Sequence, residues 1–467
     1  MATNSSESVV HLNEAIVAMV PFPDYSHVNQ LFVLARFIAS RDIPVHFLCL
    51  ADWNRDLKLR VQGGLEVSNI HFEDLSIPSS PKENDDAGRD GMPPILILLK
   101  KLREPFRKTC LELSTNAKRL VVIHDSIMRE LTRDVHAFLN VKSYIFHTGS
   151  AFSKYSGLHQ VIPDIVDDDH DKLVEKIHYE FPSLESCSGP YAEAFVRKEH
   201  EWQLNSGEIL NTSREVEGKY LDLLAQTKGN KQWWAIGPLH MLLLESQDFS
   251  NRTRHECLEF LDKQDVNSVI FVSFGTTTTF SQEQVNEIAL GLERSNHKFI
   301  WVLREAYKKT ETEKIEERDG KIELPKRFEE RAEGRGMVVR NWVPQLEILG
   351  HSSTGGFLSH CGWNSCIESI SMGVPLATWP IHYDQPFNAI IMTNLLKIGT
   401  SVRSWAHRKE LVTASTIEKT VNTLMGTIEG KEMRQRAVEL RHKIKRSVSH
   451  GGPAHKEMES FISNIIK

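Results

Sequence analysis

The chain has 467 residues, more than one globular core usually holds, so two domains fit better than one. Apolar residues make up 40% and charged residues 25%, a balance that excludes a largely disordered chain. The net charge of −6 offers no basic face to nucleic acid or anionic lipid, so a small molecule is the expected partner.

The start of the chain and its cysteines indicate a compartment. Residues 1–15 are polar and lack the basic-then-apolar order of a secretory signal, and no apolar run reaches the roughly eighteen residues that span a bilayer. The six cysteines are scattered without a CxxC pair, as expected of reduced thiols. Asn4, Asn211 and Asn251 each begin an N-x-S/T triplet, which has no meaning without secretion. We therefore expect a cytoplasmic monomer without a membrane span.

Short β-branched runs alternate with amphipathic stretches in the first half of the chain. Residues 15–22 (AIVAMVPF) predict a strand, residues 27–40 a helix and residues 45–50 a second strand, which together make one βαβ unit. Further strands are predicted at residues 119–125 and 141–148. This alternation is typical of a parallel sheet covered by helices on both faces, so the fold class is α/β.

A Gly-Pro pair closes the last strand of the first half, in the segment WWAIGPLH (233–240), and a polar segment follows. We place the domain boundary near residue 245, which gives domains of residues 1–245 and 246–467. The alternation then restarts, so the second domain is also predicted to be doubly wound. Its predicted strands lie at residues 268–276, 299–305, 336–342, 355–360 and 374–380.

The segment GGFLSHCGWNSCIES (355–369) holds the densest group of candidate site residues. In open α/β sheets ligands bind beyond the carboxyl ends of the strands, and here a strand is expected to end near Ser359. A helix then begins at residues 363–365, and its free N–H groups and positive dipole end form a seat for a diphosphate. His360 adds a donor, and Glu368, about one turn into the helix, suits the two hydroxyls of a ribose.

These residues also allow a purely structural interpretation, in which His360 and Asn364 cap a helix and Trp363 belongs to the core. A second Gly-rich turn, SFGTTTTF (273–280), follows another strand and is placed to approach the same phosphates. No GxGxxG follows the first strand and no GxxxxGK[ST] occurs, which argues against dinucleotide oxidoreductases and P-loop NTPases. The sequence contains no set of Asp, Glu and His residues at the spacing of metal ligands, so we expect no metal site.

The segment from Trp342 to Gln385 reads WVPQLEILGHSSTGGFLSHCGWNSCIESISMGVPLATWPIHYDQ. It resembles the donor-binding box of the plant secondary-product UDP-glycosyltransferases in its length and at its fixed positions. The resemblance extends over nearly the whole chain, from the PFP…H turn to the last amphipathic helix. It implies the GT-B fold: two facing Rossmann-like domains with a cleft between them, the last helix packing back on the N-terminal domain.

By this resemblance the box binds a UDP-sugar. An indole stacks on a base, and an amide meets the donor and acceptor of uracil together, so the uracil is expected on Trp342 with Gln345 at its edge. The other implied contacts are those of the diphosphate with His360, Asn364, Ser365 and Thr276, of the ribose with Glu368, and of the sugar with Asp384 and Gln385.

The end of the box bears on the choice of sugar. In the family that the chain resembles, Trp363 and a terminal Gln385 accompany a preference for UDP-glucose, and His in the latter position accompanies galactose. Glucose is therefore the expected sugar, with xylose second.

His27 and Asp125 are the expected catalytic pair. His27 follows the turn PFPDYS at the start of the first helix, where an isolated histidine is structural more often than catalytic. Its place matches the catalytic base of the family, and Asp125, the last residue of its strand, matches the carboxylate that orients the imidazole and stabilises its cation. Ser26, where relatives more often have Gly, and His124 flank the pair.

The resemblance implies an inverting transfer in which His27 takes the acceptor proton, the acceptor oxygen attacks the anomeric carbon and UDP leaves. No carboxylate nucleophile is required, and we expect no metal or cofactor beyond UDP-glucose as co-substrate. The phrases IHDSIM, HCGWNSCIES and WAHRKELVTAS look most like the zeatin O-glycosyltransferases, which act on the side-chain hydroxyl of a cytokinin.

Other interpretations stay open at this point. A flavonoid is an alternative acceptor, and attack by a ring carbon would make the chain a flavonoid C-glycosyltransferase. A protein that binds a UDP-sugar or a hormone without transferring anything is a third possibility.

Overall fold

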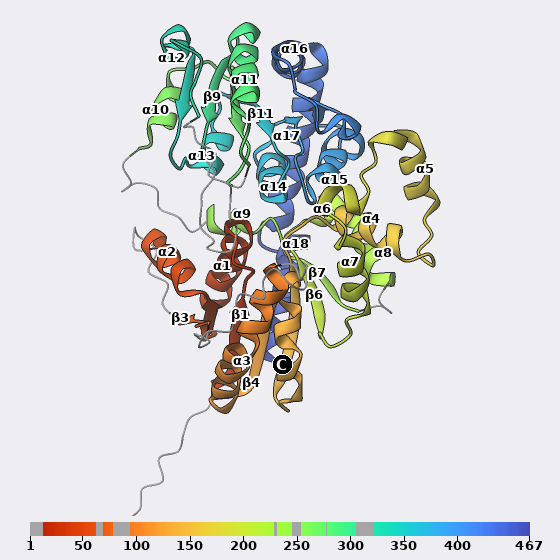
Figure 1. The fold of residues 1–467 in the computed structure, drawn as a ribbon. Helices are drawn as coiled ribbons and strands as arrows, with labels where there is room; N and C mark the ends of the chain where they lie inside the picture. Colours follow the sequence, from red (N-terminus) through yellow and green to blue (C-terminus); the bar gives the residue numbers. More distant parts are fainter. Residues whose placement is uncertain are drawn as a thin grey trace, which may run out of the picture.

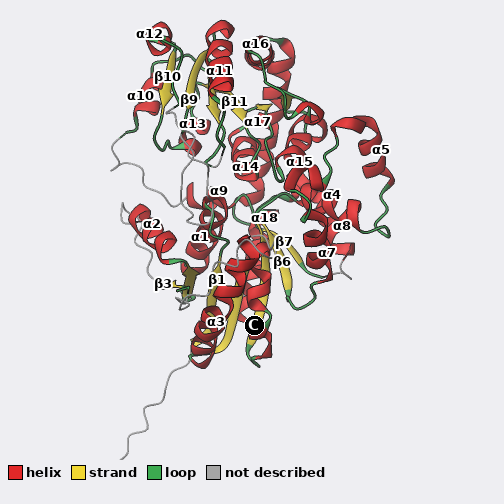
Figure 2. Cartoon of the chain, in the orientation of Figure 1, coloured by secondary structure: helices red, strands yellow, loops and turns green. Residues whose placement is uncertain are grey.

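The computed structural model describes residues 13–61, 69–77, 94–227, 231–244, 254–276, 278–304 and 322–467. The chain forms two α/β units, the first in the lower part of Figure 1 and the second above it. Helices surround the strands of both units in Figure 2. Residues 1–12 and the domain boundary near residue 245 lie outside the described residues, so that boundary stays a prediction.

The described residues of the first half form a sheet of seven parallel strands: β1 (Asn13–Val20), β2 (Val45–Cys49), β3 (Ile70–Asp74), β4 (Ala117–Asp125), β5 (Val141–His147), β6 (Gly207–Leu210) and β7 (Trp233–Ala235). Their order is β3-β2-β1-β4-β5-β6-β7. Val17 of β1 pairs with Val45 on one side and Val121 on the other. Residues 15–20 are all buried, which explains the unbroken apolar run of a strand covered on both faces.

The first half also contains the helices α1 (Tyr25–Ala39), α2 (Ala51–Val61), α3 (Pro94–Thr115), α4 (Ala151–Val161), α5 (Asp168–Ile177), α6 (Leu184–Ser188), α7 (Ala192–Glu201), α8 (Arg214–Thr227) and α9 (Leu239–Leu244), with short helical turns η2 (Ser126–Thr132), η3 (Asp134–Ala137) and η4 (His178–Glu180). Of these, α1 and α3 pack on opposite faces of the sheet. α1 begins where the Asp24 side chain accepts a hydrogen bond from the Ser26 N–H. Its apolar residues recur at helical spacing and are buried, so it lies flat on the sheet.

The second half forms a sheet of six parallel strands: β8 (Val269–Ser273), β9 (Lys298–Val302), β10 (Gly336–Val339), β11 (Thr354–Ser359), β12 (Leu376–Thr378) and β13 (Gly399–Ser401), in the order β10-β9-β8-β11-β12-β13. The helical elements around it are α10 (Glu256–Asp262), α11 (Gln282–Ser295), α12 (Phe328–Ala332), α13 (Gln345–Gly350), α14 (Trp363–Met372), α15 (Gln385–Ile390), η5 (Ile391–Leu395), η6 (Trp405–His407), α16 (Ala414–Gly426), α17 (Ile428–Val448) and α18 (Pro453–Ile466).

The last helix, α18, crosses back to the first half of the chain. Phe461 and Ile465 pack in one apolar cluster with Val17 and Trp234 of the first sheet, and Tyr144 donates a hydrogen bond of 2.6 Å to Asn464. The C-terminus accordingly lies among the elements of the first half (Figure 1). This last helix therefore joins the second half of the chain to the first.

The predicted strands are confirmed, with ends that differ by a few residues. The strands predicted at 268–276 and 299–305 end at Ser273 and Val302, because the chain turns at the carboxyl edge of the sheet. The α/β class and the two Rossmann-like units are also confirmed.

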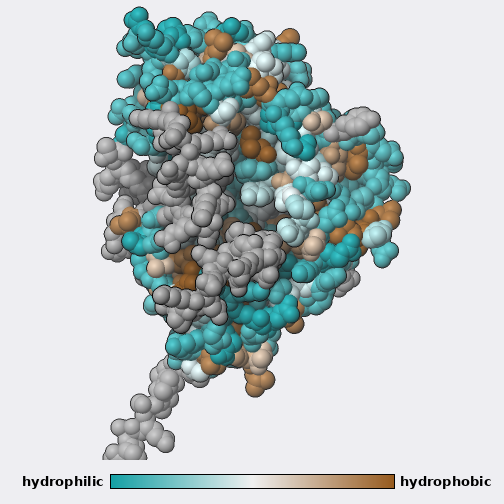
Figure 3. Space-filling model, in the orientation of Figure 1, coloured by the Kyte–Doolittle hydropathy of each residue, from teal (hydrophilic) through white to brown (hydrophobic). Residues whose placement is uncertain are grey.

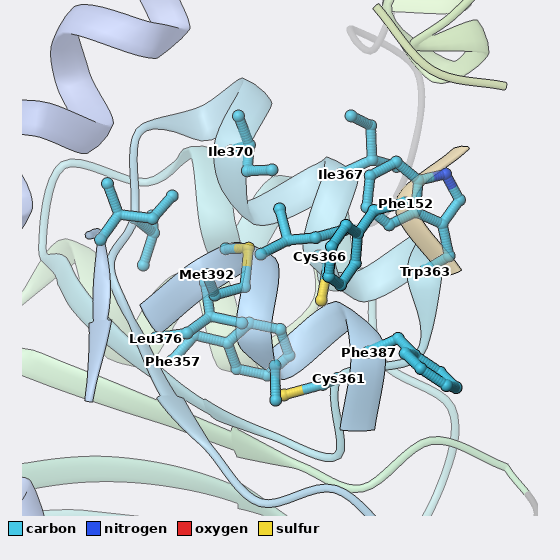
Figure 4. Packing of buried hydrophobic residues seen from close by; sticks show 14 of the residues in the cluster. Phe152, Phe357, Cys361, Trp363, Cys366, Ile367, Ile370, Leu376, Phe387 and Met392 are labelled. Atoms are coloured by element: carbon cyan, nitrogen blue, oxygen red, sulfur yellow. The ribbon is translucent and has the colours of Figure 1, made fainter. Parts of the chain in front are cut away.

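One apolar cluster extends across both halves. Phe152 of the first half lies with Trp363, Cys366 and Phe387 of the second (Figure 4), and the rings of Phe152 and Phe387 are 6.5 Å apart. The coloured part of the face in Figure 3 is mostly hydrophilic, with small scattered apolar patches. Within the described part of the chain, no helix is long and apolar enough to cross a bilayer. The same part contains no group of three or more His, Cys, Asp or Glu side chains arranged to hold a metal ion.

Candidate active site

The carboxyl edges of the two sheets face each other at the site. Nδ2 of Asn364, in the first turn of α14, donates a hydrogen bond of 3.2 Å to the carbonyl oxygen of Ser26. The indole N–H of Trp363 donates to the carbonyl oxygen of Asn211, at 2.9 Å. The first turn of α1 and the loop after β6 thus touch the start of α14, the helix that follows β11, and the candidate residues of the two halves are neighbours.

His27 and Asp125 form a close pair at the edge of the first sheet. Nδ1 of His27 lies 2.6 Å from Oδ2 of Asp125, whose side chain is fully buried, while 18% of the His27 side chain is exposed. The second carboxylate oxygen accepts the N–H of Ile127 at 2.9 Å, and the Thr148 hydroxyl lies 3.1 Å from Nδ1. Because the carboxylate keeps the proton on Nδ1, Nε2 is left to accept another.

The charges around His27 favour its protonated form. Burial opposes the cation, but the Asp125 carboxylate outweighs this effect with help from Asp24 and Asp384, so the pKa of His27 lies above its ordinary value of 6.5. Asp384 comes from the second half, where burial raises its own pKa and Asn388 donates a hydrogen bond of 2.9 Å to it. A base with this pKa accepts a proton readily near neutral pH.

The start of α14 is the predicted anion seat. The helix follows β11 after a short turn. Its N-cap residue is Gly362, so no side chain at the N-cap accepts a hydrogen bond from the first turn of the helix. The N–H groups of the first turn and the positive end of the dipole therefore face the loop region between the two sheets. Asn364 and Ser365 lie in this turn, as the sequence predicts.

His360 fills the space between this seat and the turn after β8. A Cβ atom added at Gly275 or Gly362 would lie only 2.7 or 2.6 Å from Nε2 of His360, so both glycines are needed for the ring to fit. Burial lowers the pKa of His360 to about 4, which keeps the ring neutral. Its Nδ1 is buried and makes no hydrogen bond within the described structure. The Gly-rich turn that contains Thr276 thus reaches the seat.

Hydrogen bonds connect Gln345 of α13 with Glu368 and Ser365 of α14, three residues of the predicted donor box. Nε2 of Gln345 donates to Oε2 of Glu368 at 2.8 Å and to the Ser365 hydroxyl at 3.2 Å. Burial raises the pKa of Glu368 to about 7, although the bond from Gln345 works in the opposite direction. Trp342, which precedes α13, is 67% exposed, so much of its surface is open to a ligand.

Gln385 and Trp363 are both buried and bond to other parts of the protein. The Gln385 side-chain oxygen accepts the N–H groups of Ile381 and His382, at 2.9 and 3.1 Å, and thereby holds the loop before α15. The Trp363 ring is buried and joins the two halves through its bond to Asn211. Their contributions to sugar choice stay predictions.

Sequence reasoning missed several residues that shape the site. Thr148 follows β5 and contacts His27, and Asn211 follows β6 and contacts Trp363. Glu217 accepts hydrogen bonds from the N–H groups of residues 151 and 152 and so caps α4 directly after the Thr148 loop. The usable signal was position, because two of these residues directly follow a parallel strand.

Two family models match the chain. The model of the glycosyltransferase N-terminal domain matches residues 13–241, and that of the UDP-glucoronosyl and UDP-glucosyl transferases matches residues 247–440. Among curated proteins, the chain is 47% identical to zeatin O-glucosyltransferase of Phaseolus lunatus and 43% identical to zeatin O-xylosyltransferase of Phaseolus vulgaris. Both alignments cover 100% of each chain.

Solved structures show the same architecture. The complex of Phytolacca americana UGT2 with UDP-2fluoro-glucose and pterostilbene matches with a TM-score of 0.75 and 26% identity, over 97% of this chain and 99% of that one. A UGT transferase from Siraitia grosvenorii in complex with UDP matches with a TM-score of 0.74 and 27% identity, over 97% and 100% of the two chains.

Proposed function

Because the chain belongs to the family of UDP-glycosyltransferases, enzymes with the GT-B fold, we propose that it transfers glucose from UDP-glucose to the side-chain hydroxyl of a cytokinin such as zeatin. One observation carries the proposal: the His27–Asp125 pair lies beside the open start of α14, with Asn364 bonded to the residue next to His27. A proton acceptor and a seat for a departing diphosphate are thus adjacent.

The acceptor assignment rests on the relatives and on the base. Two proteins whose names specify zeatin as the acceptor match the chain over its full length. The side chain of zeatin ends in an alcohol, which gives up its proton far less readily than a phenol and so needs a strong, oriented base. His27 with the buried Asp125 carboxylate supplies one, and the Phe22 ring, whose centroid lies 5.2 Å from that of the imidazole, adds an apolar surface beside the base.

In the proposed reaction the atoms move in one displacement. Nε2 of His27 accepts the hydroxyl proton while the acceptor oxygen forms a bond to the anomeric carbon of glucose. The bond from that carbon to the β-phosphate oxygen breaks, and its electron pair leaves with UDP. The first turn of α14 stabilises the negative charge that develops on the diphosphate, so the proposal requires no metal. An α-linked donor gives a β-glycoside.

The roles proposed for the donor box follow from the same arrangement. The uracil stacks on the exposed Trp342, and Glu368, already held by Gln345, accepts the ribose hydroxyls. Asp384 lies close enough to influence the pKa of His27, so a sugar held by Asp384 has its anomeric carbon near the base.

UDP-xylose is the second candidate donor, because the Phaseolus vulgaris relative is named as a xylosyltransferase. Transfer from UDP-glucose and UDP-xylose, each supplied alone and then together, measures the preference. We expect the hexoside to predominate.

The acceptor is tested with purified protein, UDP-glucose and a panel of zeatin, flavonoids and simple phenols, with the products read by mass. The matched control is the cytokinin that has the same purine and side chain but no hydroxyl. We expect one acid-labile hexoside of zeatin and none of the control. A product that survives acid hydrolysis would indicate a C-glycoside, and hydrolysis of UDP-glucose without any glycoside would indicate a protein that only binds its ligands.

A further inference from the structure

We propose that Asn211 is a positioning residue that sets the placement of the base helix α1 against the donor helix α14. The inference rests on the proposed role of His27 as the base. Asn211 lies at the carboxyl end of β6, is 3% exposed, and is far from both helices in the sequence.

Three polar groups of Asn211 form hydrogen bonds to three different segments. Its carbonyl oxygen accepts the indole N–H of Trp363 at 2.9 Å. Its side-chain oxygen accepts the N–H of Leu239 at 2.9 Å, and its Nδ2 donates to Oε1 of Gln30 at 2.9 Å. The N–H of Leu239 requires an acceptor, so the carboxamide cannot turn over, and its Nδ2 must face Gln30.

Gln30 extends this set of bonds to the base. It lies on α1 one turn after His27, is 5% exposed, and donates from Nε2 to the carbonyl oxygen of Thr148 at 3.0 Å. The Thr148 hydroxyl in turn lies 3.1 Å from Nδ1 of His27. Hydrogen bonds through Asn211, Gln30 and Thr148 therefore connect Trp363, at the start of α14, with the imidazole of His27.

The backbone around Asn211 is shaped to admit it. A Cβ atom at Gly237, in the Gly-Pro pair that the sequence marks as a strand end, would lie 2.5 Å from Oδ1 of Asn211. The absence of a side chain there allows the loop after β7 to close over the carboxamide. Both amide atoms of Asn211 are engaged and buried, so the N-x-S/T triplet that it begins serves a packing role here.

Positioning matters because transfer requires the acceptor oxygen, held by the base, to meet an anomeric carbon held by the other half of the protein. A misplacement of about 1 Å can cost about 10²-fold in rate. Loss of the Asn211 side chain should thus lower kcat while the donor box, whose own bonds are unchanged, still binds UDP.

The test is Asn211→Ala, assayed for kcat with zeatin at saturating UDP-glucose and for UDP affinity by calorimetry. The matched control is Asn205→Ala at the opposite end of the same strand, where the side chain is 4% exposed, donates 3.0 Å to the Gly207 carbonyl and accepts 2.7 Å from Lys231. We expect a kcat loss of about 10²-fold for Asn211→Ala, unchanged UDP affinity, and the parent kcat for Asn205→Ala.

A second variant keeps the proposal testable should Asn211→Ala fail to fold. Gln30→Met removes both bonds of Gln30 with little change in volume and should give a similar kcat loss. The double variant should lose no more than either single variant, because the bonds act as one unit. Equal kcat for the variants at 211 and 205, or additive losses at 30 and 211, would overturn the inference. A parent enzyme that forms no glycoside would instead overturn the proposed function.

Discussion

The donor side and the base side of the site are constructed in different ways. The donor side comes mainly from one segment, Trp342 to Gln385, and several of its side chains bond within that segment, as Gln345 does to Glu368. The base side joins His27 to Asp125, 98 residues away, through the neighbouring strands β1 and β4. Donor variants should therefore change binding, whereas base variants should change the rate and leave UDP affinity intact.

The largest effect is expected from His27→Ala. General-base assistance contributes about 10²–10⁴-fold, so transfer to the alcohol of zeatin should fall below detection. A phenol, with a pKa near that of tyrosine, about 10, is easier to deprotonate and should lose distinctly less. The measurement is kcat for both acceptors.

UDP affinity of the same variant is the internal control, because His27 lies across from the donor seat. Equal losses for the alcohol and the phenol, with UDP affinity intact, would mean that His27 holds the acceptor without taking its proton.

The contrast also explains what the sequence could reveal. The apolar run of β1 and the contiguous box around α14 are local patterns, so the strands and the helix start were predictable from the residues alone. The roles of His27 and Asp125 needed the resemblance to a family, because residue spacing does not show which strands become neighbours.

The Asn211–Gln30 bond joins residues 181 positions apart and follows from no local pattern. The bond from Asn364 to Ser26 likewise depends on how the two halves meet, which the sequence of neither half specifies. Only the tertiary packing of the two units determines such contacts.

A smaller effect is expected from Glu368→Ala on the donor side. The ribose would lose a charged acceptor that contributes about 1.5–3 kcal/mol, which weakens UDP binding by about 10–10²-fold. Calorimetry with UDP alone measures the change. Glu439→Ala, an exposed carboxylate on α17, is the control. An unchanged dissociation constant for Glu368→Ala would remove this residue from the site.

The pH dependence of UDP binding sharpens this point. Because burial raises the pKa of Glu368 to about 7, the free protein loses the carboxylate as the pH falls through this value. The ribose hydroxyls need the charged form, so UDP should bind more weakly at pH values below about 7. Glu368→Gln should bind UDP with an affinity that no longer varies over this range, and a persistent variation would assign it to another group.

The smallest effect is expected from Gln385→His. The substitution changes the polar group at the end of the box, so the ratio of transfer from UDP-glucose and UDP-galactose should shift. Because Gln385 also accepts hydrogen bonds from the N–H groups of Ile381 and His382, the thermal stability of the Gln385→His variant should be compared with that of the parent. A constant ratio in a competition assay would show that Gln385 does not read the sugar.

The pH–rate profile of the parent and of Asp125→Asn tests the base mechanism most directly. Only neutral His27 can accept a proton, so kcat/KM for zeatin should fall as the pH drops through its raised pKa, above 6.5. Loss of the Asp125 charge lowers that pKa, so the acidic limb of Asp125→Asn should move to lower pH while the plateau rate falls. The loss at the plateau should be smaller than that of His27→Ala. An acidic limb at the same pH in both proteins would contradict the assignment of His27 and Asp125 as the catalytic pair.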